Sequence, residues 1–178
     1  MNRLKPAVVL TAGCLWAMGS AAFALSQVQG LSAKAMLINA DGKEVGSASL
    51  YEAPGGVRVR LRVSGLPPGP HAFHIHEAGR CDPPDFKSAG GHFNPAGKKH
   101  GLKNPQGHHA GDLPDLVVGA DGVGSAEVTV DGVTLLEGEN SLFHPGGTAL
   151  VIHASPDDNL SDPAGNAGTR IACGVITR

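Results

Sequence analysis

Short runs in which apolar and polar side chains alternate recur along the chain, and they predict β-strands. The clearest run is residues 57–63, where valine or leucine alternates with arginine, so that one face of the strand would be buried and the other solvated. Similar runs, separated by turns rich in glycine, proline, asparagine and aspartate, predict strands over residues 32–38, 43–51, 71–76, 115–118, 124–130, 149–153 and 170–176. The pattern therefore predicts an all-β domain of seven or eight short strands.

Two long stretches between these strands have no strand pattern. Residues 77–114 run for nearly forty positions and contain four of the nine histidines and one cysteine. A loop of that length in a compact domain needs something to order it, and a metal and a disulfide would do so. A second polar loop covers residues 155–169.

The N-terminal segment has the features of a secretory signal peptide. Arg3 and Lys5 precede an apolar run over residues 7–18, and small residues at 20–24 offer a cleavage site after Ala24. We therefore predict a signal peptide over residues 1–24 and one exported domain over residues 25–178, with the periplasm as the expected compartment. A lipoprotein signal at Cys14 is the weaker alternative, because the apolar run continues past this cysteine.

Charge and cysteine content agree with an exported domain. Removal of residues 1–24 takes away two positive charges and no negative ones, so the formal net charge goes from −2 to about −4. A mildly acidic domain gives no indication of nucleic-acid binding. Cys81 and Cys173 would remain, and in an exported chain such a pair is expected to form one disulfide.

The candidate chemistry begins at residues 73–76, with the sequence Phe-His-Ile-His. Side chains alternate along a strand, so His74 and His76 would point to one face and Ile75 to the other. Neutral imidazole is a common ligand of zinc and copper. This strand would therefore supply half of a metal site.

Seven residues along the chain are candidate ligands, and they fall into two groups. One loop supplies three imidazoles and a carboxylate, which suit tetrahedral zinc: His92, His100, His109 and Asp112. Two strands supply a nitrogen-only set that suits copper: His74, His76 and His153. Two four-coordinate sites made from seven residues require one shared ligand, and a histidine can bind one metal through each ring nitrogen.

The mature chain resembles the bacterial copper/zinc superoxide dismutases over nearly all of its length. Five motifs in the family's order carry this resemblance: Phe-His-Ile-His-Glu at 73–77, Gly-Gly-His-Phe-Asn-Pro at 90–95, His-Ala-Gly-Asp-Leu-Pro at 109–114, Leu-Val-Ile-His at 150–153 and Gly-Asn-Ala-Gly-Thr-Arg-Ile-Ala-Cys-Gly-Val-Ile at 165–176. The resemblance implies an eight-stranded Greek-key antiparallel β-barrel or sandwich. It also implies an enzyme that converts two superoxide anions and two protons into dioxygen and hydrogen peroxide.

The resemblance assigns a role to each candidate residue. It implies one copper ion, cycling between Cu(II) and Cu(I), on four histidines: His74, His76, His92 and His153. It implies one zinc ion on His92, His100, His109 and Asp112, so that His92 bridges the metals and takes part in proton supply. Arg170 matches the arginine that lies over the copper, and Cys81 and Cys173 match the family's disulfide.

The resemblance also bears on one aspartate and on the three remaining histidines. The family's aspartate that links a copper histidine to a zinc histidine falls at Asp157, with the adjacent Asp158 as the alternative. His71 matches a structural histidine, His109 is favoured over its neighbour His108 as the zinc ligand, and His144 is expected to be a loop residue. The family usually has glycine at position 72, where this chain has alanine.

Two other functions could use residues of these types. A metal carrier or storage protein would lack a copper ligand or Arg170, and neither is missing. A zinc hydrolase would need an open position on the zinc, whereas this set is already filled by four protein ligands. The sequence leaves open whether the protein is a homodimer and whether a partner delivers copper.

Overall fold

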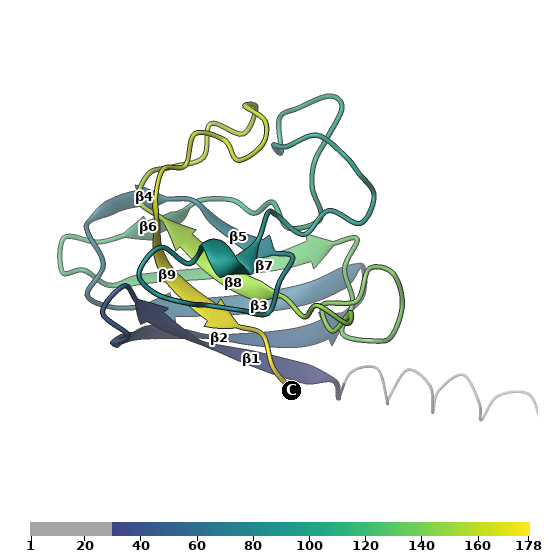
Figure 1. Ribbon diagram of the computed structural model, residues 1–178, viewed down its shortest axis with the longest axis horizontal. Helices are drawn as coiled ribbons and strands as arrows, with labels where there is room; N and C mark the ends of the chain where they lie inside the picture. Colours follow the sequence, from purple (N-terminus) through teal and green to yellow (C-terminus); the bar gives the residue numbers. More distant parts are fainter. Residues whose placement is uncertain (1–29) are drawn as a thin grey trace, which may run out of the picture.

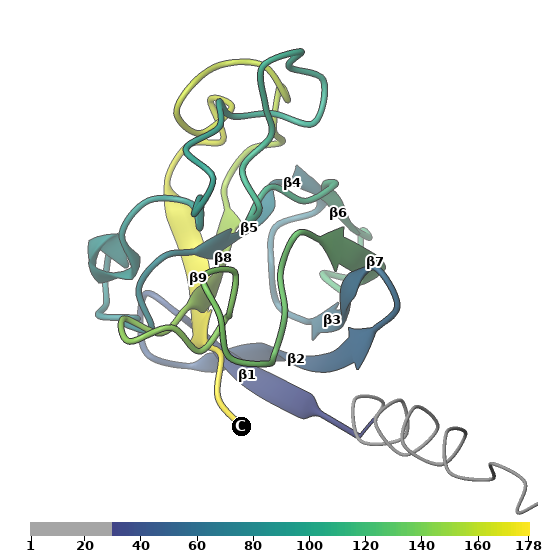
Figure 2. The same ribbon diagram turned by 90° about the vertical axis from the view of Figure 1, so that its right-hand side faces the viewer.

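Antiparallel strands form one sheet that curls into a nearly closed barrel, as the end-on view in Figure 2 shows. The computed structural model describes residues 30–178, and within them it contains nine strands and one short 3₁₀ helix, η1. Their bounds are β1 Ser32–Asn39, β2 Glu44–Ala53, β3 Gly56–Val63, β4 Gly69–His71, β5 Phe73–His76, η1 Lys87–Ala89, β6 Leu116–Val118, β7 Gly124–Asp131, β8 Ala149–His153 and β9 Arg170–Val175.

The sheet order places strands that are distant in the sequence beside one another. The order is β4-β6-β7-β3-β2-β1-β9-β8-β5, so β3 pairs with β7 and β1 pairs with β9. The predicted all-β Greek-key architecture is confirmed, with one difference. The strand predicted over residues 71–76 is divided at Ala72, whose N–H donates to Ser155 and whose carbonyl accepts from His153. Because Ala72 forms these hydrogen bonds, the strand is interrupted there, and β4 and β5 lie at opposite ends of the sheet.

The interior is filled by the apolar positions of the alternating patterns. In β3, Val57, Val59 and Leu61 are buried, whereas the intervening arginines are exposed. Each such side chain contributes about 1.5–3 kcal/mol relative to an exposed position. In β5 the same alternation sends Ile75 into the core and turns the two neighbouring histidines toward the loops outside the barrel.

Two long loops lie against the outside of the barrel, above β5, β8 and β9 in Figure 1. The first follows β5 and the second, residues 154–169, joins β8 to β9. The predicted disulfide is present: Cys81 in the first loop is bonded to Cys173 in β9. The loop that had no strand pattern is thus attached covalently to the last strand of the barrel.

The predicted signal peptide lies outside the described residues. Over residues 30–178, no helix has the length and apolar character needed to cross a membrane.

Candidate metal centre

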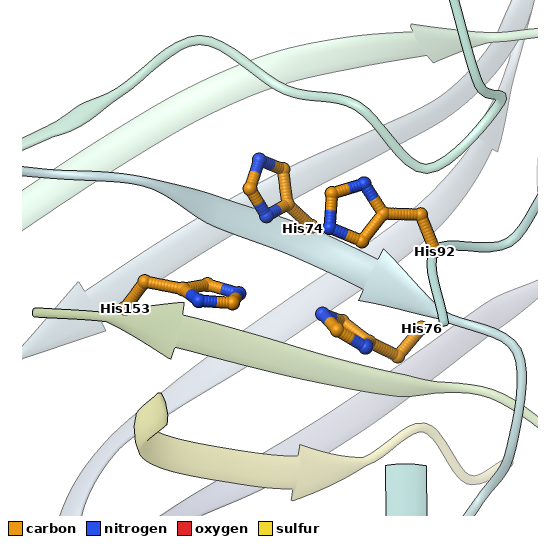
Figure 3. A group of neighbouring side chains, drawn as sticks. All are labelled: His74, His76, His92 and His153. Atoms are coloured by element: carbon orange, nitrogen blue, oxygen red, sulfur yellow. The ribbon is translucent and has the colours of Figure 1, made fainter. Parts of the chain in front are cut away.

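Four histidines meet at the outer face of β5 and β8. His74 and His76 come from β5, His153 from the end of β8, and His92 from the first long loop, and Figure 3 shows the four rings turned toward a common centre. The two strands are paired in register, with His74 opposite Val151 and His76 opposite Ala149. Strand pairing therefore sets the backbone positions of His74, His76 and His153, and the loop supplies His92.

In these four rings the inward nitrogens are buried and have no hydrogen-bond partner among the described residues. They are Nδ1 of His74 and Nε2 of His76, His92 and His153. The ligand atoms of the four residues lie within 4.8 Å of one another. A buried polar atom without a partner is costly, and four that converge on one point fit a metal ion that accepts nitrogen ligands.

The outer nitrogens of three of these rings are held by hydrogen bonds. Nε2 of His74 donates to Oδ2 of Asp157 at 2.7 Å, and Nδ1 of His76 donates to the carbonyl of Gly90 at 3.0 Å. Nδ1 of His153 lies 3.3 Å from the carbonyl of Gly168. A hydrogen bond at the outer nitrogen fixes the tautomer that leaves the inner nitrogen free to bind a metal.

A second set of donors lies beside the first, in the long loop. Its members are buried and their ligand atoms lie within 4.8 Å of one another: His92, His100, His109 and Asp112. Oδ1 of Asp112 lies 2.8 Å from Nδ1 of His92, 3.1 Å from Nδ1 of His100 and 3.3 Å from Nδ1 of His109. Tetrahedral zinc with ligand bonds of about 2.0–2.1 Å separates its ligands by about 3.3 Å. The donor types and their spacing fit this ion.

His92 belongs to both sets. Its Nδ1 faces Asp112, while its Nε2 is the buried, unpaired atom directed at the other three histidines. His92 follows Gly91, and both Gly91 backbone groups are bonded to Glu77, whose N–H donates to the Gly91 carbonyl and whose Oε1 accepts from the Gly91 N–H. The loop residue that joins the two sets is therefore fixed to the end of β5.

Asp157 links the two sets from the other side. Its carboxylate accepts from Nε2 of His74 at 2.7 Å and from Nε2 of His100 at 3.0 Å. The neighbouring Asp158 points away, because its carboxylate accepts from backbone N–H groups of Leu160 and Ser161. Of the two aspartates considered from the sequence, Asp157 is thus the one that contacts the rings.

Arg170 lies at the start of β9 and is half-buried. Its guanidinium donates to the carbonyl of Phe86 and to the carbonyl of Gly90, each at 2.6 Å. The Gly90 carbonyl also accepts from His76, so one backbone oxygen positions both the arginine and a candidate ligand. The sequence did not indicate Phe86 and Gly90 as site residues. Both bind Arg170 through their backbone carbonyl oxygens, which the residue type does not reveal.

The electrostatics of the protein chain alone favour neutral rings in the first set. Burial lowers the pKa of His92 to about 4, against the opposing hydrogen bond to Asp112. Burial, with the nearby His74, lowers the pKa of His153 to about 3. Burial also holds the pKa of His76 well below its usual value. A histidine binds a metal in its unprotonated form, so these shifts favour coordination.

The two buried carboxylates remain ionised. Burial opposes ionisation of Asp112, but hydrogen bonds from His100, His109 and His92 outweigh it and hold its pKa far below the usual range. For Asp157, burial is likewise outweighed by hydrogen bonds from His100 and His74, which lower its pKa. Between these carboxylates, the pKa of His100 rises to about 9 although burial acts in the opposite direction.

The three remaining histidines lie outside both sets. His71 is buried and its ring is held by the carbonyls of His153 and Pro67, at 2.8 and 2.7 Å. His108 is bonded through Nδ1 to the carbonyl of His109, and its ring does not join the second set. His144 stacks on Phe93, with ring centroids 5.3 Å apart.

A nearly closed Greek-key barrel with adjacent four-histidine and three-histidine-one-aspartate sets defines a protein of the two-metal, imidazole-bridged class. The family described as "Copper/zinc superoxide dismutase (SODC)" matches residues 44–176. The chain belongs to this family, and it is therefore an oxidoreductase that uses copper and zinc and acts on superoxide.

Relatives from three bacteria support this placement. "Superoxide dismutase [Cu-Zn] 2" of Aquifex aeolicus is 59% identical over 150 residues, which cover 83% of this chain and 88% of the relative. The crystal structure of a SOD-like protein from Bacillus subtilis has a TM-score of 0.78 at 43% identity, over 80% of this chain and 96% of that one. The Cu/Zn superoxide dismutase from Brucella abortus has a TM-score of 0.67 at 34% identity, over 82% and 99%.

Proposed function

We propose that this protein dismutates superoxide with the residues that form the two sets. Copper would be held by His74, His76, His92 and His153, and zinc by His92, His100, His109 and Asp112. The observation that carries the proposal is the convergence of four buried, unpaired imidazole nitrogens. Copper supplies the one-electron chemistry, which zinc cannot, and each cycle converts two superoxide anions and two protons into dioxygen and hydrogen peroxide.

His92 is the proton-handling residue in this proposal. Its Nε2 has no hydrogen-bond partner among the described residues; this atom would be a copper ligand in one half of the cycle and, when it is not bound to the metal, would hold the proton that is released to the departing peroxide. Its other nitrogen stays directed at Asp112, which keeps the ring in place while the proton moves. The pair of bonds between Gly91 and Glu77 keeps the backbone before His92 fixed.

Arg170 is the proposed anion-binding residue. Its guanidinium is always charged, and two of its N–H groups are bonded to backbone carbonyls, so it is fixed in orientation. Its remaining N–H groups can donate to a superoxide anion beside the first set of histidines. A positive group at this position raises the association rate of a small anion, and added salt weakens the effect.

The test compares three single variants after copper and zinc loading. We expect Arg170→Ala to lower the cyanide-sensitive rate of superoxide decay about tenfold or more, because charge-assisted anion binding is lost. His92→Ala should abolish the activity, since it removes the shared ligand and the proton carrier. His144→Ala, which lies outside both sets, should stay within about twofold of the parent rate.

Metal analysis of the same samples separates the outcomes. A parent protein that binds one copper and one zinc yet does not accelerate superoxide decay would contradict dismutation and favour a metal carrier. Unchanged activity in His92→Ala would contradict the role of the shared histidine.

We further propose that residues 1–24 are a signal peptide and that the mature domain, residues 25–178, acts in the periplasm. The bond between Cys81 and Cys173 supports this, because structural disulfides persist in oxidising compartments. N-terminal sequencing of protein from a periplasmic extract should begin at Leu25. Protein that retains Met1 in the cytoplasmic fraction would contradict export, and a lipid-modified Cys14 would favour the lipoprotein alternative.

A further inference from the structure

The two long loops lie side by side outside the barrel, as both views in Figures 1 and 2 show. The backbone N–H of Lys103 in the first loop donates to the carbonyl of Asn159 in the second at 3.2 Å. Gly101 has φ +108°, and a β-carbon there would overlap the backbone of Asn159, so the contact is tight. The second loop therefore packs directly against the chain around His100.

His100 lies beside this contact and takes part in four hydrogen bonds. Both of its ring nitrogens are engaged, Nδ1 with Asp112 and Nε2 with Asp157. Its backbone carbonyl accepts from the side chain of Asn104 at 2.9 Å. Its backbone N–H donates to Oδ1 of Asp162 at 2.8 Å. The second loop thus supplies two of these four hydrogen bonds, one to the ring and one to the backbone.

Asp162 is bound through both of its oxygens. While Oδ1 accepts from His100, Oδ2 accepts from Nζ of Lys99 at 2.8 Å. The Lys99 and Asp162 side chains are 56% and 41% exposed. An exposed ion pair of this kind contributes little to stability. The bond to His100 is different, because it fixes the backbone of a residue whose side chain is buried.

We propose that Asp162 is a positioning residue for the zinc site. Through Oδ1 it holds the backbone of His100 so that Nδ1 of this ring stays directed at the donors of the second set. Its effect should fall on zinc retention and much less on copper, since the copper histidines of β5 and β8 are held by strand pairing. This inference rests on the proposed role of His100 as a zinc ligand.

The test measures zinc affinity by competition with a chromogenic chelator, on the full mature protein. Loss of a hydrogen bond that orients a ligand typically lowers metal affinity 10–100-fold, so we expect Asp162→Ala to bind zinc about tenfold more weakly. Copper affinity should change less than about threefold. With Co²⁺ in place of zinc, the visible spectrum of this variant should shift, because the geometry around His100 relaxes.

Two variants separate the contributions of the two oxygens. Asp162→Asn keeps an oxygen that can accept from the His100 N–H, and Lys99→Gln removes only the ion pair, so each should lose less than about threefold in zinc affinity. Glu127→Gln is the matched control, because it removes an exposed ion pair with Arg60 on β3, away from the loops. It should leave zinc affinity and the Co²⁺ spectrum unchanged.

The outcomes that would overturn the inference are distinct. Zinc affinity within twofold of the parent in Asp162→Ala would show that the His100 backbone needs no such hydrogen bond. A loss in Lys99→Gln as large as in Asp162→Ala would assign the effect to charge instead. If Asp162→Ala does not fold, a tenfold loss in Asp162→Asn would likewise contradict the role of Oδ1. A parent protein that binds no zinc would instead refute the ligand assignment itself.

Discussion

At the scale of single residues, the site depends on carboxylates that each serve several histidines. Asp112 presents one oxygen to three rings, and Asp157 presents one oxygen to His74 and the other to His100. Gly165 lies against this last pair, since a β-carbon at its position would overlap Oδ1 of Asp157 and Nε2 of His100. The orientation of one histidine from each set therefore depends on one buried side chain.

This arrangement predicts the effect of Asp157→Asn. An amide has a single acceptor oxygen, so one of the two rings would face an N–H₂ group and lose its hydrogen bond. We expect copper and zinc to be retained about tenfold less well, as measured by metal content after dialysis against a chelator. Asp158→Asn is the control, because Asp158 contacts its own loop and neither ring. Equal metal retention in the two variants would contradict this prediction.

The candidate metal-binding side chains are the part of the site that the sequence indicated most completely. His74 and His76 could be identified because alternation places both on one face, and the remaining donors because their spacing matches known motifs. The carbonyls of Phe86 and Gly90, which hold Arg170, could not be found in this way. A backbone oxygen is present at every residue, so only the folded path of the chain selects the two that act.

At the scale of elements, the disulfide ties the segment that holds Arg170 to a barrel strand. Cys81 lies five residues before Phe86, and its partner Cys173 lies three residues after Arg170 in β9. Arg170 and the two carbonyls that it binds thus lie within the chain segment that the disulfide closes into a loop. The sequence predicted this disulfide, but it did not predict that β4 and β5 part at Ala72, because their apolar pattern continues unbroken.

We expect the double variant Cys81→Ser, Cys173→Ser to be less stable by about 4–5 kcal/mol, the value that the chain-entropy relation gives for a closed loop of this length. The sequence separation of the two cysteines is 92 residues. The free energy of unfolding, from urea titration of the metal-loaded protein, is the quantity to compare. Parent protein treated with reductant should reproduce the loss, and a change below about 1 kcal/mol would contradict it.

At the scale of the whole molecule, the buried histidines predict how the stability of the metal-free protein depends on pH. Burial lowers the pKa of His92 to about 4 and that of His153 to about 3, and it also lowers the pKa of His76, so the unfolded chain takes up protons below pH 6.5 that the folded chain accepts only at lower pH. Stability therefore falls as the pH drops through this window.

His100 has the opposite effect on the alkaline side. Its pKa is raised from 6.5 to about 9, so between these values the folded chain keeps a proton that the unfolded chain releases. Stability from this group is complete below pH 6.5 and is lost as the pH rises through 9. Urea unfolding of metal-free protein at pH 5, 6.5 and 8.5 should give a maximum near 6.5. A steady rise in stability from pH 6.5 to 9 would be inconsistent with this assignment.

The position of β5 at the end of the sheet has a consequence for solubility. Its free edge is covered by the first long loop, where Ile75 donates to Gly111 and accepts from Phe93, and Glu77 donates to Gly91. The segments that cover this edge also carry His92, His109 and Asp112. An uncovered strand edge is a template for pairing with another chain. Metal binding by these residues should therefore protect the protein from aggregation, because the bound ions would also hold the loop over the edge.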